Sequence, residues 1–190
     1  MHRRIIVLVA ALAALMALAP AASATDKGGW WGDKSYGSTK LEVDPGTLAA
    51  LTSLGVAPGV VEPATLEGAT YKFPITNPFR NALRTGVIRH SGGISLTAGS
   101  TTVELTDFNI KLLQGQLYGR VNGSDRVALL DLDYSDVGIR FRGGRLIVGP
   151  VGTTLTAGAA DALNAAFGVD ALSDDTVIGD ATIRYRVFGW

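Results

Sequence analysis

The stretch from Ile88 to Thr97, IRHSGGISLT, decides the fold class because its side chains alternate with the period of two that is typical of a β-strand. One phase of the alternation is mostly apolar and consists of Ile88, His90, Gly92, Ile94 and Leu96. The other phase is polar and includes Arg89, Ser91, Ser95 and Thr97. A strand with this pattern places one face on a core and the other in solvent. We therefore expect His90 to point to the apolar side.

Segments with the same period lie on both sides of this stretch, from residue 70 to the end of the chain. They cover residues 71–75, 103–112, 116–121, 137–141, 146–148 and 178–190. The phase of the apolar residues changes near Asp107, which predicts a bulge or bend there. Asn122-Gly123 predicts a hairpin turn. Val127 to Leu132 is almost continuously apolar and predicts a central strand buried on both faces.

Two short helices interrupt the strands. Asp44-Pro45 is a typical helix start, and the apolar spacing that follows predicts a helix over residues 45–54. Apolar residues at helical spacing over 155–167, with Thr156 as the cap, predict a second helix. The whole pattern predicts a mainly β protein, an antiparallel β-sandwich or flattened barrel with two short α-helices.

The first 24 residues have the pattern of a secretory signal peptide. Basic residues at positions 2–4 precede an apolar run, and Ala22-Ser23-Ala24 matches a cleavage site. The alternative is an uncleaved membrane anchor, but the apolar run is shorter than the roughly 20 residues that a spanning helix needs. We expect cleavage after Ala24, a secreted protein that is extracellular or associated with the cell surface, and no transmembrane anchor in the mature chain.

Two segments are expected in the remaining chain. Residues 25–40 are rich in glycine, serine and lysine around a few aromatic residues, which predicts a flexible leader. Residues 41–190 are expected to form a single β-rich domain.

The composition excludes several classes of protein. The chain has 190 residues, of which 47% are hydrophobic and 18% charged, and this composition is typical of a folded domain. Because there is no cysteine, the protein has no disulfide, no thiolate metal site and no cysteine nucleophile. The formal net charge of zero argues against binding to nucleic acid or broadly to an anionic membrane.

Enzymatic chemistry is also poorly supported. After the signal segment His90 is the one histidine, and the sequence has no G-x-S-x-G motif. Ser91 follows His90 but belongs to the opposite face of the strand, so the two cannot form a nucleophile and base pair. We predict a protein that is not an enzyme. For His90 itself, a packed imidazole with hydrogen-bonded ring nitrogens is the simpler alternative to a ligand-binding role.

Two charged clusters have structural and functional interpretations. Asp131, Asp133 and Asp136 could hold calcium, but they lack the glycine and the final glutamate of an EF-hand loop, and we expect them to bond to turn amides. A basic stripe is formed by Arg140, Arg142, Arg145, Arg184 and Arg186. These arginines alternate on solvent-facing strand positions, and we expect them to pair with acids across the strands.

Five segments carry a resemblance to a known family. They are FPIT at 73–76, GVIRHSGGISL at 86–96, LTDF at 105–108, the segment 115–123, and the alanine-rich segment 159–167. Together they resemble the HtaA-type domain, a haem-uptake domain of secreted and surface proteins of actinobacteria. The resemblance implies haem as the ligand, with a tyrosinate on the iron and a histidine hydrogen-bonded to that tyrosine. It places His90 at the histidine position and Tyr36, in WGDKSY at 31–36, at the tyrosine position, with Trp30, Trp31 and Phe73 beside the porphyrin.

Two functional hypotheses remain open. The first is a secreted, non-enzymatic module that binds haem or another small apolar ligand in a groove near His90. The second is a structural or adhesive protein of the cell envelope with the same fold and no cofactor, in which His90 and the glycines serve packing. A tyrosine such as Tyr36, Tyr71 or Tyr118 close to His90, in a cavity large enough for a porphyrin, would favour the first.

Overall fold

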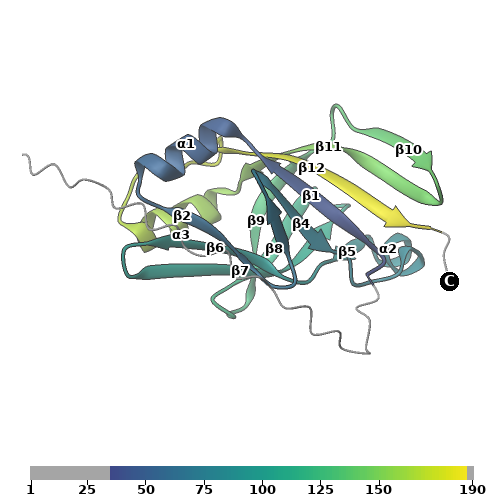
Figure 1. Ribbon diagram of the computed structural model, residues 1–190, viewed down its shortest axis with the longest axis horizontal. Coiled ribbons are helices and arrows are strands. Elements are labelled where there is room, and N and C mark those ends of the chain that lie inside the picture. Colours follow the sequence, from purple (N-terminus) through teal and green to yellow (C-terminus); the bar gives the residue numbers. More distant parts are fainter. Residues whose placement is uncertain (1–34, 188–190) are drawn as a thin grey trace, which may run out of the picture. The chain divides into compact units, whose positions relative to one another are not determined.

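Strands make up most of residues 35–187, the part of the chain that this computed structural model describes. The strands of this part are β1 Gly37–Val43, β2 Ala57–Val61, β3 Thr65–Glu67, β4 Thr70–Pro74, β5 Val87–Arg89, β6 Gly93–Ala98, β7 Thr101–Lys111, β8 Gln116–Val121, β9 Arg126–Asp133, β10 Gly138–Arg142, β11 Arg145–Leu155 and β12 Val177–Arg186. The helices are α1 Pro45–Ser53, α2 Phe79–Thr85 and α3 Ala157–Phe167 (Figure 1). The predicted signal peptide and most of the predicted leader lie outside the described residues.

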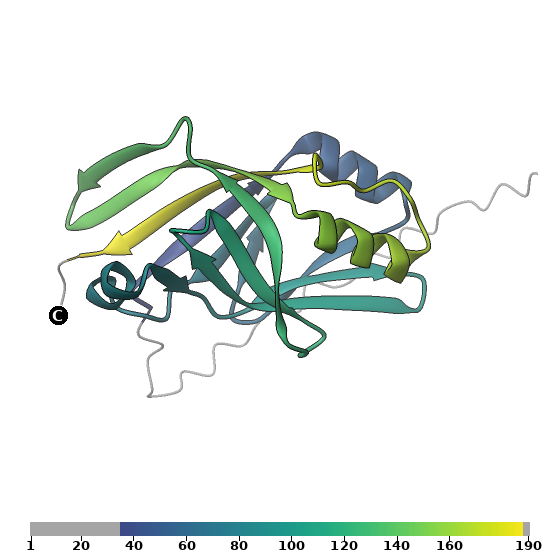
Figure 2. The ribbon, with the colours of Figure 1, turned by 180° about the vertical axis from the view of Figure 1, so that it is seen from behind.

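The strands form one sheet that curls into a nearly closed barrel (Figures 1 and 2). Its strand order is β2-β6-β7-β8-β9-β11-β12-β1-β4-β3, and neighbouring strands are antiparallel. Only the three residues 62–64 separate the end strands β2 and β3 along the chain. β5 pairs with β7, and a bridge between Ile75 and His90 connects this part of the sheet to the end of β4. The mainly β fold is confirmed, and it is a barrel rather than a sandwich.

Both predicted helices are present and lie together at one end of the barrel (Figures 1 and 2). The Asp44 side chain caps α1 by accepting from the Thr47 amide at 3.1 Å. The Thr156 hydroxyl accepts from the Ala159 amide at 3.2 Å and caps α3. None of the helices in the described residues is both long and apolar enough to cross a lipid bilayer.

Local irregularities follow the sequence closely. Asp107 has a φ angle of 55°, and the pairing of β7 with β8 shifts register between Thr106 and Asn109, which confirms the predicted bulge. Asn122 has a φ of 49° and Gly123 a φ of 73°, as the predicted turn between β8 and β9 requires.

Three features differ from the sequence prediction. Helix α2 was not predicted, because seven residues are too few to show a helical period. The expectation that Val127 to Leu132 is buried on both faces was wrong: in β9 Leu129 is buried, but Val127 is 45% exposed. The strand borders a cavity, so its apolar side chains face that space instead of two packed layers. β1 begins at Gly37, so residues 37–40 belong to the sheet and not to the flexible leader that was predicted for residues 25–40.

The core has two parts. The larger cluster lies between the sheet and the helices α1 and α3, and includes Phe73, Phe108 and Leu163. The smaller cluster includes Ile75 and Tyr185. The hairpin of β10 and β11 continues past this smaller cluster, at the end of the barrel away from α1 and α3 (Figures 1 and 2).

Candidate functional site

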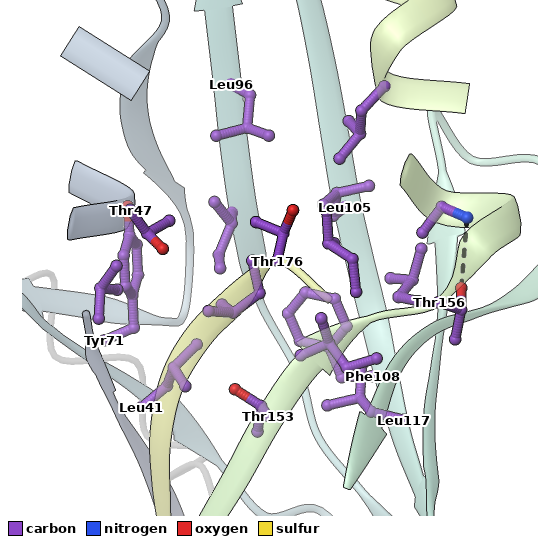
Figure 3. A pocket seen from close by; sticks show the side chains of 18 of the residues that line it. Leu41, Thr47, Tyr71, Leu96, Leu105, Phe108, Leu117, Thr153, Thr156 and Thr176 are labelled. Carbon is purple, nitrogen blue, oxygen red and sulfur yellow. Dashed lines mark hydrogen bonds between the residues drawn. The ribbon is translucent and has the colours of Figure 1, made fainter. Parts of the chain in front are cut away.

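A large apolar cavity lies inside the barrel, next to α1 and α3. Its volume is about 900 Å³. Aliphatic side chains of α1, α3 and the surrounding strands form most of its wall, and Figure 3 shows Leu96 and Leu105 among them, together with the aromatic side chain of Phe108. Small-molecule sites in proteins have volumes of roughly 300–1,000 Å³ and predominantly hydrophobic linings. The cavity therefore has the size and lining of a site for an apolar small molecule.

The polar groups of the wall mostly have partners within the protein. Within residues 35–187, Asp44 is the one carboxylate or cationic side chain that lines the cavity, and it is engaged as the cap of α1. The Thr153 hydroxyl donates to the Gly179 carbonyl at 2.7 Å. The Thr156 hydroxyl donates to the Ala128 carbonyl at 2.9 Å. A ligand would therefore be held chiefly by apolar contacts rather than by ion pairs.

His90 lies in this wall, directly after β5. Its side chain is 5% exposed, and its amide donates to the Phe108 carbonyl at 2.8 Å. The predicted position on the apolar side of the strand is confirmed. The sheet brings it beside β1, where its Nε2 lies 2.7 Å from the Thr39 hydroxyl oxygen.

The partners of the imidazole determine its protonation. Nδ1 lies 3.2 Å from the Phe108 carbonyl oxygen, which can only accept, so Nδ1 carries the hydrogen. In the neutral ring Nε2 then accepts from the Thr39 hydroxyl. Burial disfavours the charged form and lowers the pKa of His90 from 6.5 to about 4, although the bond to the Phe108 carbonyl acts in the opposite direction. His90 is therefore neutral at physiological pH.

The glycines after His90 are required by close packing. A side chain at Gly92, whose φ is 78°, would place its Cβ 2.3 Å from the Ala64 amide nitrogen. A Cβ at Gly93 would lie 2.1 Å from the Leu105 carbonyl oxygen. Both distances are shorter than any real contact, so this corner of the barrel closes only with glycine at the two positions.

Ile75 lies between Tyr36 and His90, because its backbone bonds to Tyr36 and pairs with His90. The backbone of Tyr36 pairs with Ile75 and Arg186, and the side chain of Tyr36 packs on the smaller core cluster. It is absent from the described residues that line the cavity. The structure thus places His90 in the cavity wall and Tyr36 outside it.

The two other candidate tyrosines have different partners. Tyr71 lines the cavity, and its hydroxyl donates to the Gly59 carbonyl at 3.2 Å. The Tyr118 hydroxyl donates to Gln116 at 3.0 Å, and the Lys111 ammonium lies 3.5 Å from the centre of its ring. The hydroxyl that reaches His90 belongs to Thr39.

Two of the three clustered aspartates, Asp131 and Asp133, have structural partners. Asp133 accepts from the amide and the hydroxyl of Ser135 at 2.9 and 3.0 Å, as predicted for a turn. The expected bond to a turn amide was wrong for Asp131, which accepts from the Gln116 side chain on the neighbouring strand β8 at 2.9 Å. Within the described residues, no group of three or more acidic or histidine side chains is placed to hold a metal ion.

Sequence reasoning missed Thr39 and the cavity itself. Thr39 and His90 are 51 positions apart, and no local pattern connects them. The alternation of β1, in which Thr39, Leu41 and Val43 share the buried phase, was the one signal that could have placed Thr39 in the interior. A cavity cannot be inferred from alternation at all, because a strand facing a packed core has the same pattern.

Comparisons with known proteins agree with the resemblance. No protein-family model and no curated protein matches the sequence. Among solved structures, the chain is similar to the C-terminal domain of HtaA from Corynebacterium glutamicum, with a TM-score of 0.56, 12% identity, and coverage of 78% of this chain and 94% of that domain. It is also similar to the heme binding protein HtaB from the same organism, with a TM-score of 0.54, 12% identity, and coverage of 78% and 91%. The chain therefore shares the fold of the HtaA C-terminal domain and of HtaB.

Proposed function

We propose that this protein is a non-enzymatic module that binds a large apolar ligand in the cavity next to α1 and α3, and that haem is the first ligand to test. The observation that carries the proposal is the cavity of about 900 Å³, whose wall is apolar. Burying an apolar molecule there would remove both its surface and the wall from water, which is the main source of affinity in such sites. The haem-binding description of the similar protein HtaB supports haem as the first choice.

The residues fit some requirements of haem better than others. The apolar wall, with Tyr71 and Phe108 among its aromatic members, suits a porphyrin ring. In the haem proposal Tyr36 would ligate ferric iron as a tyrosinate, and His90 would hydrogen-bond to it. His90 Nε2 is bonded to Thr39 and Tyr36 lies outside the wall, so these roles require β1 to shift relative to His90.

The charged groups of haem place a second requirement on the site. The propionates are anionic, and the described wall contains no lysine or arginine to pair with them. They would therefore have to reach solvent at the mouth of the cavity. The wall itself suits a neutral apolar ligand equally well.

The second candidate is a structural or adhesive protein of the cell envelope without a cofactor. It is favoured by the saturated hydrogen bonds of His90, which serve packing without any ligand. Export of the protein, after cleavage following Ala24, is part of both proposals, because the pattern of residues 1–24 is independent of what the domain binds.

The test is a titration of the purified protein with three probes: ferric haem, iron-free protoporphyrin, and a neutral apolar fluorophore such as Nile red. Binding is followed by the Soret absorption or by fluorescence. Ala166→Trp, on the α3 face that lines the cavity, is expected to reduce binding of all three probes by steric exclusion. Ala165→Trp is the matched control, because Ala165 is exposed on the same helix and does not line the cavity.

Each outcome separates the hypotheses. Saturable haem binding that is lost in Ala166→Trp and weakened in Tyr36→Phe would support haem and the role of Tyr36. Equal affinity for haem and for protoporphyrin would support an apolar-ligand module and contradict iron ligation. No saturable binding of any probe would contradict the proposal and favour the envelope protein without a cofactor.

A further inference from the structure

Five arginines lie together on the outer face of strands β10, β11 and β12. The register places Arg142 opposite Arg145, and Arg145 opposite Arg186, so that three arginines form one row across three strands. A second row lies two residues farther along each of these strands. In it, Arg140 is opposite Ile147, and Ile147 is opposite Arg184. Paired residues of antiparallel strands share a face, so all five guanidinium groups project from the same surface.

These arginines have no acidic partners in the described part of the chain. The expectation that they pair with acids across the strands was wrong, because their cross-strand neighbours are other arginines, Ile147 and Ser38. The ion pairs within residues 35–187 join Arg120 and Arg126 to Asp107, on β7 to β9. Like charges directly opposite each other destabilise a sheet, so this arrangement costs folding free energy unless an external anion neutralises it.

The same surface is hollowed between the arginine side chains. A depression of about 340 Å³ is lined by Arg142, Gly143, Arg145, Ile147 and Arg184. Gly143 contributes no side chain at this point, and the rest of the lining consists of three arginines and the apolar side chain of Ile147. Planar guanidinium groups donate pairs of hydrogen bonds to phosphate and carboxylate oxygens. A tetrahedral phosphate presents oxygens in several directions, so it can bond to three arginines at once more readily than a planar carboxylate can.

We propose that this arginine face, Arg140, Arg142, Arg145, Arg184 and Arg186, binds a linear polymer whose repeating unit carries a phosphate group. The hollow receives one phosphate, and the remaining arginines contact the neighbouring units. A polymer is indicated rather than a single anion because the five charges spread over three strands, each about 4.8 Å from the next. The site is separate from the cavity and independent of what the cavity binds.

The test measures binding of the purified protein to long-chain inorganic polyphosphate at several salt concentrations. The triple variant Arg142→Gln, Arg145→Gln, Arg184→Gln removes the arginines of the hollow. We expect its affinity for polyphosphate to fall at least about tenfold. We also expect the slope of log K against log salt concentration to become shallower, by about one for each arginine that contacts phosphate. The matched control is Arg80→Gln, Arg84→Gln, Arg89→Gln, which removes the same charge from exposed positions elsewhere and should change affinity less than about twofold.

Three results would overturn the proposal. An equal loss in both triple variants would show that net charge, not this face, controls binding. Equal binding of polyglutamate would contradict the preference for phosphate. Binding to phosphatidylglycerol vesicles without binding to polyphosphate would assign the face to a membrane instead. Thermal unfolding of each variant checks its fold, and if the triple variant does not fold, Arg142→Gln and Arg184→Gln are compared singly with Arg80→Gln.

Discussion

His90 shows how one residue couples the barrel to pH. Its ring is enclosed, its Nδ1 hydrogen points to the Phe108 carbonyl, and its Nε2 accepts from Thr39. A second proton on Nε2 would require Thr39 to turn its hydroxyl hydrogen away and accept instead. The charged form would also be buried without a carboxylate beside it, which is why burial is the larger cause of the lowered pKa.

We predict that the protein loses stability as the pH falls from about 6.5 to about 4. In that range the unfolded chain binds a proton at His90 and the folded chain does not, because the folded pKa is about 4. The loss approaches about 3 kcal/mol at the lower end. Urea unfolding between pH 7 and pH 4 measures it. The His90→Gln variant, which keeps one donor and one acceptor, should have a flatter profile over this range, and an unchanged profile would contradict the assignment.

We predict that Thr39→Val destabilises the protein by about 1–3 kcal/mol. The substitution keeps the shape of the side chain but leaves Nε2 of the buried His90 without a hydrogen-bond partner. Thermal unfolding measures the change, and Thr39→Ser, which retains the hydroxyl, is the control. If both variants lose the same stability, packing rather than the hydrogen bond is responsible.

Helix α3 has a role in the fold and in the cavity at once. It begins where β11 ends, and Thr156 at this junction both caps the helix and donates to the Ala128 carbonyl of β9. Ala159, Ala162, Leu163 and Ala166 of this helix line the cavity. Small side chains at three of these four positions leave the space that a ligand would fill.

We predict that Thr156→Ala destabilises the protein by about 1–2 kcal/mol and weakens binding of any cavity ligand. The Ala159 amide loses its cap and the Ala128 carbonyl loses a donor, so the start of α3 is held less firmly against the wall. Chemical denaturation and titration with the apolar fluorophore give the two values. Thr156→Ser should stay close to the original protein in both measurements.

At the opposite end of the barrel, we predict that Arg145→Gln raises the unfolding temperature. Arg145 has an arginine opposite it on each side, Arg142 and Arg186, so neutralising it removes two repulsive neighbours. The gain should be about 1–2 °C in low salt and smaller in high salt, because salt screens exposed charges. Arg89→Gln is the control, since Arg89 is opposite Asn109. A lower unfolding temperature in low salt would contradict like-charge repulsion at this row.

For the whole molecule, the cavity is a region that the chain leaves unfilled. Protein interiors are normally packed as densely as organic crystals, and the side chains around an unfilled space lose van der Waals contacts on that side. The stacked pair of Tyr71 and Phe73 and the edge contact of Phe73 with Phe108 belong to one wall, while α1 and α3 form the other side. A ligand that fills the space would restore these missing contacts.

We predict that a cavity ligand at about 100 times its dissociation constant raises the unfolding temperature by roughly 5–10 °C. Binding to the folded state alone contributes about 2.7 kcal/mol at that concentration. Removing the ligand by gel filtration should reverse the shift. The Ala166→Trp variant should not respond, whereas Ala165→Trp should, and a shift of equal size in both would place the ligand outside the cavity.

Some of this protein could be predicted from residues that are close in the chain. The strand period around His90, the caps at Asp44 and Thr156, the bulge at Asp107 and the turn at Asn122 all depend on the conformational preferences of a few neighbouring residues. These features were visible in the sequence because the backbone energy that determines them is local. They specified a mainly β chain with two helices.

The sequence by itself thus determined the mainly β class, the helices α1 and α3, and the position of His90 on an apolar face, but not helix α2 or the exposure of Val127 in β9. Only the tertiary structure decided that Thr39 is its partner, that the barrel encloses a cavity, and that Arg142, Arg145 and Arg186 meet in one row. The physical reason is register. An alternating strand can pair with many others while burying the same face, and which residues then meet depends on contacts summed over the whole sheet.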